Sequence, residues 1–158
     1  MSRFRQTLPH PLRGSALLFT AVCAMACAGT RPTDLGVSGG MLRACPSSPN
    51  CVSSGAEDAG HKVAPLVLSA PAAQAWAAAR EAVLALPRTV IVSEQEGYLH
   101  AECTSARMGY VDDLELARVG NRIEVRSASR VGYGDGGVNR ARVAAVRAAL
   151  VQAGVVAQ

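Results

Sequence analysis

The stretch YVDDLELARVGNRIEVRSASR, residues 110–130, decides the fold of this chain. Apolar and polar residues alternate on both sides of Gly120-Asn121, as in two strands joined by a tight turn. A two-residue turn places Glu115 opposite Arg126 in such a hairpin. The same register gathers four apolar side chains on one face: Leu114, Leu116, Ile123 and Val125. The stretch therefore predicts an antiparallel hairpin, residues 110–118 and 122–130, with one face in the core.

The flanking sequence predicts further strands and two helices, from apolar alternation and from apolar residues at helical spacing. We expect a short extended run over residues 63–68 and two strands over residues 89–94 and 97–105. The two helices are expected over residues 72–86 and 138–153. Two helices can cover one face of a four-stranded antiparallel sheet. We therefore predict an α+β fold, a two-layer sandwich with both helices on one face, and a single domain over residues 45–158.

Residues 1–26 have the features of a secretory signal peptide. Three arginines precede an apolar segment, residues 16–26, and small residues lie directly before Cys27. The segment is shorter than a spanning helix, which needs about 20 residues. The small residues before Cys27 resemble the bacterial lipobox, which predicts cleavage there and acylation of Cys27 with palmitate or similar chains. A plain cleaved signal and an uncleaved anchor are the alternatives.

Residues 27–44 link this leader to the domain. They are rich in Gly, Ser, Thr and Pro without an apolar period, which predicts a lipidated N-terminus followed by a flexible tether. Ala28 stands where Asp is the usual signal for retention in the inner membrane. By resemblance to that sorting rule, we expect a lipid anchor in the outer membrane, facing the periplasm of the cell envelope.

The charge of the chain argues against nucleic acid as a partner. The formal net charge is +4 at pH 7, but the three arginines of residues 1–26 account for three of these charges and leave +1. Aromatic residues are 4% of the chain, so a basic stripe with interleaved aromatic residues is missing. We therefore expect no nucleic-acid partner.

Two cysteines, Cys45 and Cys51, enclose five residues, of which two are proline. In an exported chain this spacing predicts a local disulfide. A redox pair, or a metal site completed by His61, His100 or Cys103, are the alternatives, although C-x5-C matches neither the C-x2-C redox motif nor the common zinc spacings. Cys103 is in phase with the apolar face of its strand, which predicts a buried free thiol.

The densest group of polar residues lies between Tyr110 and Arg142. Asp112 is in phase with the core-facing residues of its strand, opposite Ser129, and a buried carboxylate needs hydrogen-bond donors. Its nearest expected donors are Ser127, Ser129, Arg130 and Arg140. The candidate binding residues of the whole group are Asp112, Arg126, Ser127, Ser129, Arg130, Asp135, Asn139 and Arg140. They predict either a buried network that holds the sheet to the last helix or a cleft with a poised carboxylate.

The run Gly132-Tyr-Gly-Asp-Gly-Gly137 matches G-x-G-x-x-G between a strand and a helix. A dinucleotide site also needs a further strand and an acidic residue about 20 positions on, which do not follow here, so we expect no cofactor. A helix N-terminus beside Arg130 and Arg140 can attract an anion. The alternative is that the glycines only permit a tight turn.

On the other face of the sheet, His100 and Glu102 point the same way because they are two positions apart on one strand. They share this face with Tyr98, Asp113, Glu115 and Arg126, and the two-layer fold predicts that it is exposed. His100 with Glu102 forms either an acid–base pair or part of an ordinary solvated sheet face.

Four segments occur in the order CPSSPNCVSS, GYLHAECTS, GYVDDLEL and RSASRVGYGDGGVNRAR. Together they resemble an uncharacterised family, a domain of unknown function in bacterial envelope proteins and plastid relatives. The resemblance covers about residues 45–152 and implies an envelope location, but it implies no activity.

We therefore expect an envelope lipoprotein with a non-enzymatic binding or accessory domain, whose partner is a small anionic ligand or an envelope protein. One alternative is an envelope hydrolase or another enzyme that uses Asp112 or the pair His100 and Glu102. The other is a purely structural subunit.

Overall fold

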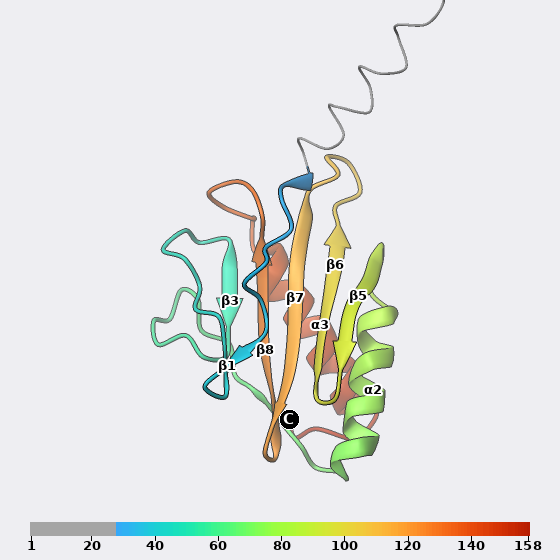
Figure 1. The fold of residues 1–158 in the computed structure, drawn as a ribbon. Helices are drawn as coiled ribbons and strands as arrows, with labels where there is room; N and C mark the ends of the chain where they lie inside the picture. The colour runs from blue at the N-terminus through green and yellow to red at the C-terminus, as the bar shows by residue number, and fades with distance from the viewer. Residues whose placement is uncertain (1–27) are drawn as a thin grey trace, which may run out of the picture.

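The computed structural model describes residues 28–158, so the predictions for residues 1–27, including the signal peptide and the lipidation of Cys27, lie outside the described residues. The elements in chain order are β1 Val37–Ser38, β2 Met41–Leu42, β3 Cys51–Ser53, β4 Leu66–Val67, α2 Ala72–Leu84, β5 Thr89–Gln95, β6 Tyr98–Thr104, β7 Val111–Val119, β8 Arg122–Ser129 and α3 Val138–Gln152. β1 and β2 form a separate hairpin, and the other six strands form one antiparallel sheet. Figure 1 shows this sheet with α3 behind it and α2 beside β5.

The α+β class is confirmed, but the main sheet has six strands and not the predicted four. The four predicted strands are β5 to β8, which lie side by side in sequence order. β3 and β4 both pair with β8, the first along its C-terminal half and the second at its start. They have only three and two residues, too few for the alternation that identifies a strand in a sequence.

The register of the β7–β8 hairpin is the predicted one. Leu116 pairs with Val125, and Glu115 pairs with Arg126, across the turn at Gly120-Asn121. Gly120 has a φ of 58°, the left-handed conformation that a tight hairpin turn requires and that glycine adopts without strain.

The core lies between the sheet and the two helices, which cover one face that we call the helix face (Figure 1). The sheet contributes buried leucines such as Leu99, Leu114 and Leu116, and each adds about 1.5–3 kcal/mol by leaving water. The helices contribute side chains at helical spacing: Ala75, Ala79, Val83, Val143, Val146 and Leu150. Within residues 28–158, no helix is long and apolar enough to cross a membrane.

The opposite face of the sheet, the outer face, is covered by residues 28–44, which run across it in Figure 1. The backbone N–H of Gly36 donates to Oε1 of Glu115 at 2.9 Å, and Arg31 pairs with Glu102. We expected a flexible tether here, and an exposed outer face beneath it. The expectation of exposure is wrong: Tyr98, Asp113, Glu115 and Arg126 are buried. Residues 28–44 show no apolar periodicity, yet they cover the sheet, because they contact it through a backbone N–H group and a charged side chain.

Candidate functional site

Most of the polar residues singled out on the helix face lie at one end of the sheet, where β7 begins, β8 ends and α3 begins (Figure 1). A hollow of about 510 Å³ opens there between the β6–β7 loop and the β8–α3 loop. We call it the Asp112 hollow, and its walls include Ser105, Tyr110, Asp112, Ser129, Asp135 and Val138.

A second hollow of about 400 Å³ adjoins the first, because Ser105, Asp112 and Val138 line both. Cys103 also lines it, and among the described residues this is the free cysteine, as predicted. Burial raises the pKa of the Cys103 thiol, which keeps it protonated and makes it a weak nucleophile.

The carboxylate of Asp112 is held by Arg142, whose Nη2 donates to Oδ2 at 2.7 Å. Both side chains are about nine-tenths buried. This corrects the sequence prediction, which named other donors and missed Arg142. Arg142 follows Asn139 by three positions, so both lie on the same stripe of α3, whereas Arg140 points elsewhere. The helical period would have found this residue.

Asn139 is fully buried and connects three elements. Its Nδ2 donates to the backbone carbonyl of Asn50 and to Oγ of Ser129, both at 3.0 Å. Its Oδ1 accepts from Ser127 and from Arg142, each at 2.6 Å. Every polar atom of this amide therefore has a partner, which fixes the start of α3 against β8 and the loop before β3.

Asp135 caps α3. Its carboxylate accepts the backbone N–H groups of Gly137 at 2.9 Å and Asn139 at 2.8 Å. Burial alone would raise the pKa of Asp135, but these backbone hydrogen bonds outweigh it and hold the pKa below its usual range. Gly137 has a φ of 84°, which a side-chain-bearing residue adopts only with strain. The backbone N–H groups at the start of α3 thus donate to Asp135, and the glycine run forms the tight turn that brings this carboxylate to them.

Arg126 and Arg130 do not join this group, because residues that alternate along a strand point to opposite faces. Nη1 of Arg126 donates to Glu115 at 3.1 Å, and its buried Nε has no hydrogen-bond partner among the described residues. Arg130 holds the carboxylate of Asp113 with Nε and Nη2, at 2.9 and 2.6 Å, and also pairs with Glu102. Both arginines are buried ion-pair partners on the outer face.

His100 pairs with Asp113 and not with Glu102, the partner that the sequence suggested. Its Nε2 lies 2.7 Å from Oδ1 of Asp113, and both side chains are buried. Burial alone would raise the pKa of Asp113, but hydrogen bonds from His100 and Arg130 outweigh it and hold this pKa below its usual range. Arg31 and Arg130 lower the pKa of Glu102 in the same way. None of these groups lines either of the two hollows described above.

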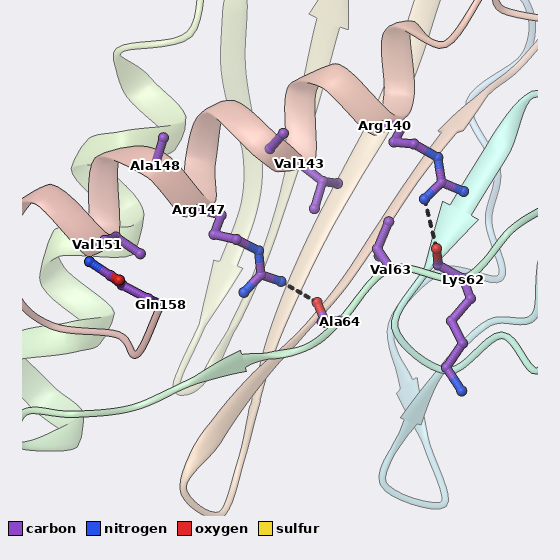
Figure 2. A pocket seen from close by; sticks show the side chains of 10 residues that line it. Lys62, Val63, Ala64, Arg140, Val143, Arg147, Ala148, Val151 and Gln158 are labelled. Atoms are coloured by element: carbon purple, nitrogen blue, oxygen red, sulfur yellow. Dashed lines mark hydrogen bonds between the residues drawn. The ribbon is translucent and has the colours of Figure 1, made fainter. Parts of the chain in front are cut away.

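Arg140 lies apart from both groups. Its guanidinium donates to the carbonyl oxygens of Gly60 and Lys62, at 2.7 Å each. Figure 2 shows it beside a third hollow, of about 480 Å³, between α3 and residues 62–64. Arg147 donates in the same way to the carbonyl of Ala64. These two arginines of α3 hold residues 60–64 through the backbone carbonyls of that loop. The rest of the hollow is lined mostly by alanine and valine.

The predicted disulfide between Cys45 and Cys51 is present, with 5.7 Å between the Cα atoms. His61, one proposed metal ligand, instead binds the carboxylate of Asp58 and the carbonyl of Ser48 through its two ring nitrogens. The described part of the chain contains no group of three His, Cys, Asp or Glu side chains that could hold a metal ion. The metal alternative for these cysteines therefore has no ligand set in residues 28–158.

The Asp112 hollow is lined by a group of polar side chains that the start of β7, the end of β8 and the start of α3 hold in fixed positions. Its carboxylates already have donors, Arg142 for Asp112 and two backbone amides for Asp135. A carboxylate oxygen can accept more than one hydrogen bond, and three hydroxyl-bearing residues, Ser105, Ser129 and Tyr110, line the same cavity. The site thus offers two carboxylates, which only accept, and hydroxyl groups that can accept or donate, and it suits a ligand that donates hydrogen bonds.

In a comparison with known proteins, the chain matches a family model described as "Protein of unknown function (DUF1499)" over residues 41–150. No curated protein and no solved structure matches the chain. The matched range includes the ion pair of Asp112 with Arg142, that of Asp113 with Arg130, and both hollows that Asp112 lines.

Proposed function

The chain belongs to the family described as "Protein of unknown function (DUF1499)", and we propose that it is an exported, lipid-anchored protein of the cell envelope that binds a small ligand in the Asp112 hollow. The ligand carries hydroxyl or ammonium groups. The domain holds it without transforming it. The anchor is Cys27, and the domain faces the periplasm.

Export is supported by the disulfide between Cys45 and Cys51. Disulfides persist in oxidising compartments such as the periplasm and are rare where thiol reductants are abundant. The leader of residues 1–26, with small residues before Cys27, supports the same location and the lipid anchor.

The observation that carries the binding proposal is the carboxylate of Asp112, fixed by Arg142 at the wall shared by two hollows. Because Asn139 holds Arg142 and Ser129 through hydrogen bonds, this wall is preorganised before any ligand enters. The arginines expected to attract an anion are engaged elsewhere: Arg126 and Arg130 with carboxylates, Arg140 with backbone carbonyls. This favours a hydrogen-bond donor over the anionic ligand that the sequence suggested.

Catalysis finds less support than binding in the described residues. His100 and Asp113 are buried beneath residues 28–44 and line no hollow. Cys103 lines a hollow, but burial raises the pKa of its thiol. Arg142 holds the Asp112 carboxylate in an ion pair, and this fixed position suits a hydrogen-bond acceptor better than a proton shuttle.

The binding proposal is tested by thermal unfolding of the full acylated chain in detergent, with sugars, polyols, amines and small anions as separate probes. A ligand present at about 100 times its dissociation constant adds about 2.7 kcal/mol of stability, which a melting curve resolves. We expect a shift with a hydroxyl or ammonium compound, and its loss in Asp112→Asn and in Tyr110→Ala.

Two variants separate a lost site from a damaged fold. Tyr110 lines the hollow but is 41% exposed, so its removal leaves the core intact. Asp34→Asn, in the exposed segment before β1, is the matched control and keeps the shift. A shift that survives both site variants places the ligand elsewhere, and a shift only with anions contradicts the proposed ligand class.

A further inference from the structure

Four large apolar or aromatic side chains protrude at the same end of the molecule as the Asp112 hollow. Met108 and Tyr110 belong to the β6–β7 loop, Tyr133 to the β8–α3 loop, and Val138 begins α3. Their exposed fractions are 55%, 41%, 78% and 50%, although the exposure of large apolar surface to water is unfavourable. We call these four residues the loop rim. In Figure 1 the two loops project side by side at this end of the sheet.

The beginning of the described chain is held at the same end. A Cβ atom built on Gly29 would lie 2.8 Å from Cβ of Arg130 and 2.9 Å from Cγ1 of Val131, so residue 29 touches the start of the β8–α3 loop. Arg31 pairs with Glu102, near the end of β6 that leads into the β6–β7 loop. In Figure 1 the blue start of the described chain lies between these two loops.

We propose that the loop rim rests on the lipid surface, at the level of the headgroups. This rests on the proposed acylation of Cys27, which is two residues from Gly29. Because one residue spans at most about 3.6 Å, an acyl chain on Cys27 enters the bilayer within about 10 Å of residue 29. A domain held by so short a link has its adjacent loops at the membrane surface.

The chemistry of the rim fits this partner. Tyrosine is enriched at membrane–water interfaces, where its ring contacts acyl chains and its hydroxyl stays in the wet headgroup layer. Arg107 is exposed beside Met108 and can meet lipid phosphates. A stable protein partner needs about 800 Å² of contact on each side, whereas four side chains on separate loops offer a narrow edge. An edge is sufficient when an acyl chain already supplies most of the attachment.

The test uses tryptophan fluorescence of the full acylated chain in phosphatidylcholine and phosphatidylglycerol vesicles with brominated acyl chains, which quench only nearby tryptophans. The chain has one tryptophan, Trp76, which lines a hollow with Glu96 and Gly97 at the opposite end of the sheet. Tyr133→Trp adds a probe on the loop rim. Glu96→Trp adds a matched control at the β5–β6 turn, where the side chain is 96% exposed.

We expect brominated lipid to remove most of the fluorescence that Tyr133→Trp adds, and to leave the parent and Glu96→Trp nearly unchanged. Equal quenching of both added probes, or of neither, while the protein floats with the vesicles, overturns the docked orientation and leaves the lipid anchor standing. If the parent floats no better than Cys27→Ser, the anchor fails and the orientation that rests on it fails too.

Discussion

Arg130 is the residue on which the charges of the outer face depend. Its side chain is 5% exposed and pairs with the buried Asp113 through two hydrogen bonds, and with Glu102. In Arg130→Ala both carboxylates lose this partner, and breaking a buried pair on one side costs about 3 kcal/mol. We expect a loss of that size in the free energy of unfolding, measured by urea titration with tryptophan fluorescence.

The matched control is Arg122→Ala, which breaks the pair with Glu124 beside the β7–β8 turn, where the Arg122 side chain is 55% exposed. Exposed pairs contribute about 0–1 kcal/mol, so this variant should unfold close to the parent midpoint. An equal loss in both variants would mean that burial beneath residues 28–44 does not strengthen the outer-face pairs.

Acid should weaken the same group. Burial alone would raise the pKa of Asp113, but His100 and Arg130 hold it below the usual range, so folding favours the charged carboxylate. The stability from this pairing is full above the unfolded pKa of about 4 and is lost as pH falls through the lower folded pKa. Unfolding free energy should therefore decline steeply below about pH 4. In Asp113→Asn the decline should be shallower, and an unchanged slope would exclude Asp113 as its source.

At the scale of single elements, the start of α3 depends on Asp135. Its carboxylate accepts two backbone N–H groups that would otherwise have no partner in the first turn. Removal of such a cap costs about 1 kcal/mol, so Asp135→Ala should lower the unfolding free energy by that amount. Asp135→Asn, which keeps an acceptor oxygen, should lose less. A larger loss in the Asn variant would contradict the capping role.

The disulfide stabilises β3, which begins at Cys51 and pairs with β8 at the edge of the sheet. The chain-entropy relation for so short a loop gives about 2 kcal/mol. The double variant Cys45→Ala and Cys51→Ala should lose that amount in urea unfolding. Reduction of the parent should give the same loss, whereas Cys103→Ala should still respond to reductant. A parent indifferent to reductant would show that the bridge adds no stability.

How well the sequence predicted each element depends on how local its determinants are. The β7–β8 hairpin follows from alternation and from the turn at Gly120-Asn121, both contained in 21 consecutive residues, and its register is confirmed. β3 is too short for a period, and its pairing depends on β8, more than 70 residues away. Arg142 could have been found from the spacing to Asn139 on α3. The cover of the outer face could not, because it uses a backbone N–H and a single arginine.

In the whole molecule, two consecutive residues of β7 serve opposite faces. Asp112 points to the helix face and pairs with Arg142, and Asp113 points to the outer face and pairs with Arg130. One strand thus ties α3 to the sheet and, through Arg130 and Glu102, ties the sheet to Arg31. The start of the described chain and the Asp112 hollow are therefore connected through β7 and a short series of ion pairs at one end of the fold.

The contact between residues 28–44 and the sheet should control how easily a protease separates the domain from the lipid anchor that we propose at Cys27. Gly36 donates its N–H to the buried Glu115 and has a φ of 119°. Proline has no N–H and holds φ near −65°, so Gly36→Pro should release this segment from the outer face. Trypsin should then cleave after Arg43 and free the domain from vesicles faster than it frees the parent. Asp34→Asn, which breaks only the exposed pair with Arg43, should be released at the parent rate or slightly above it. If trypsin frees the parent as fast as Gly36→Pro, residues 28–44 do not stay on the sheet in solution. The domain would then be joined to Cys27 by a long flexible link, which would not hold the loop rim at the membrane.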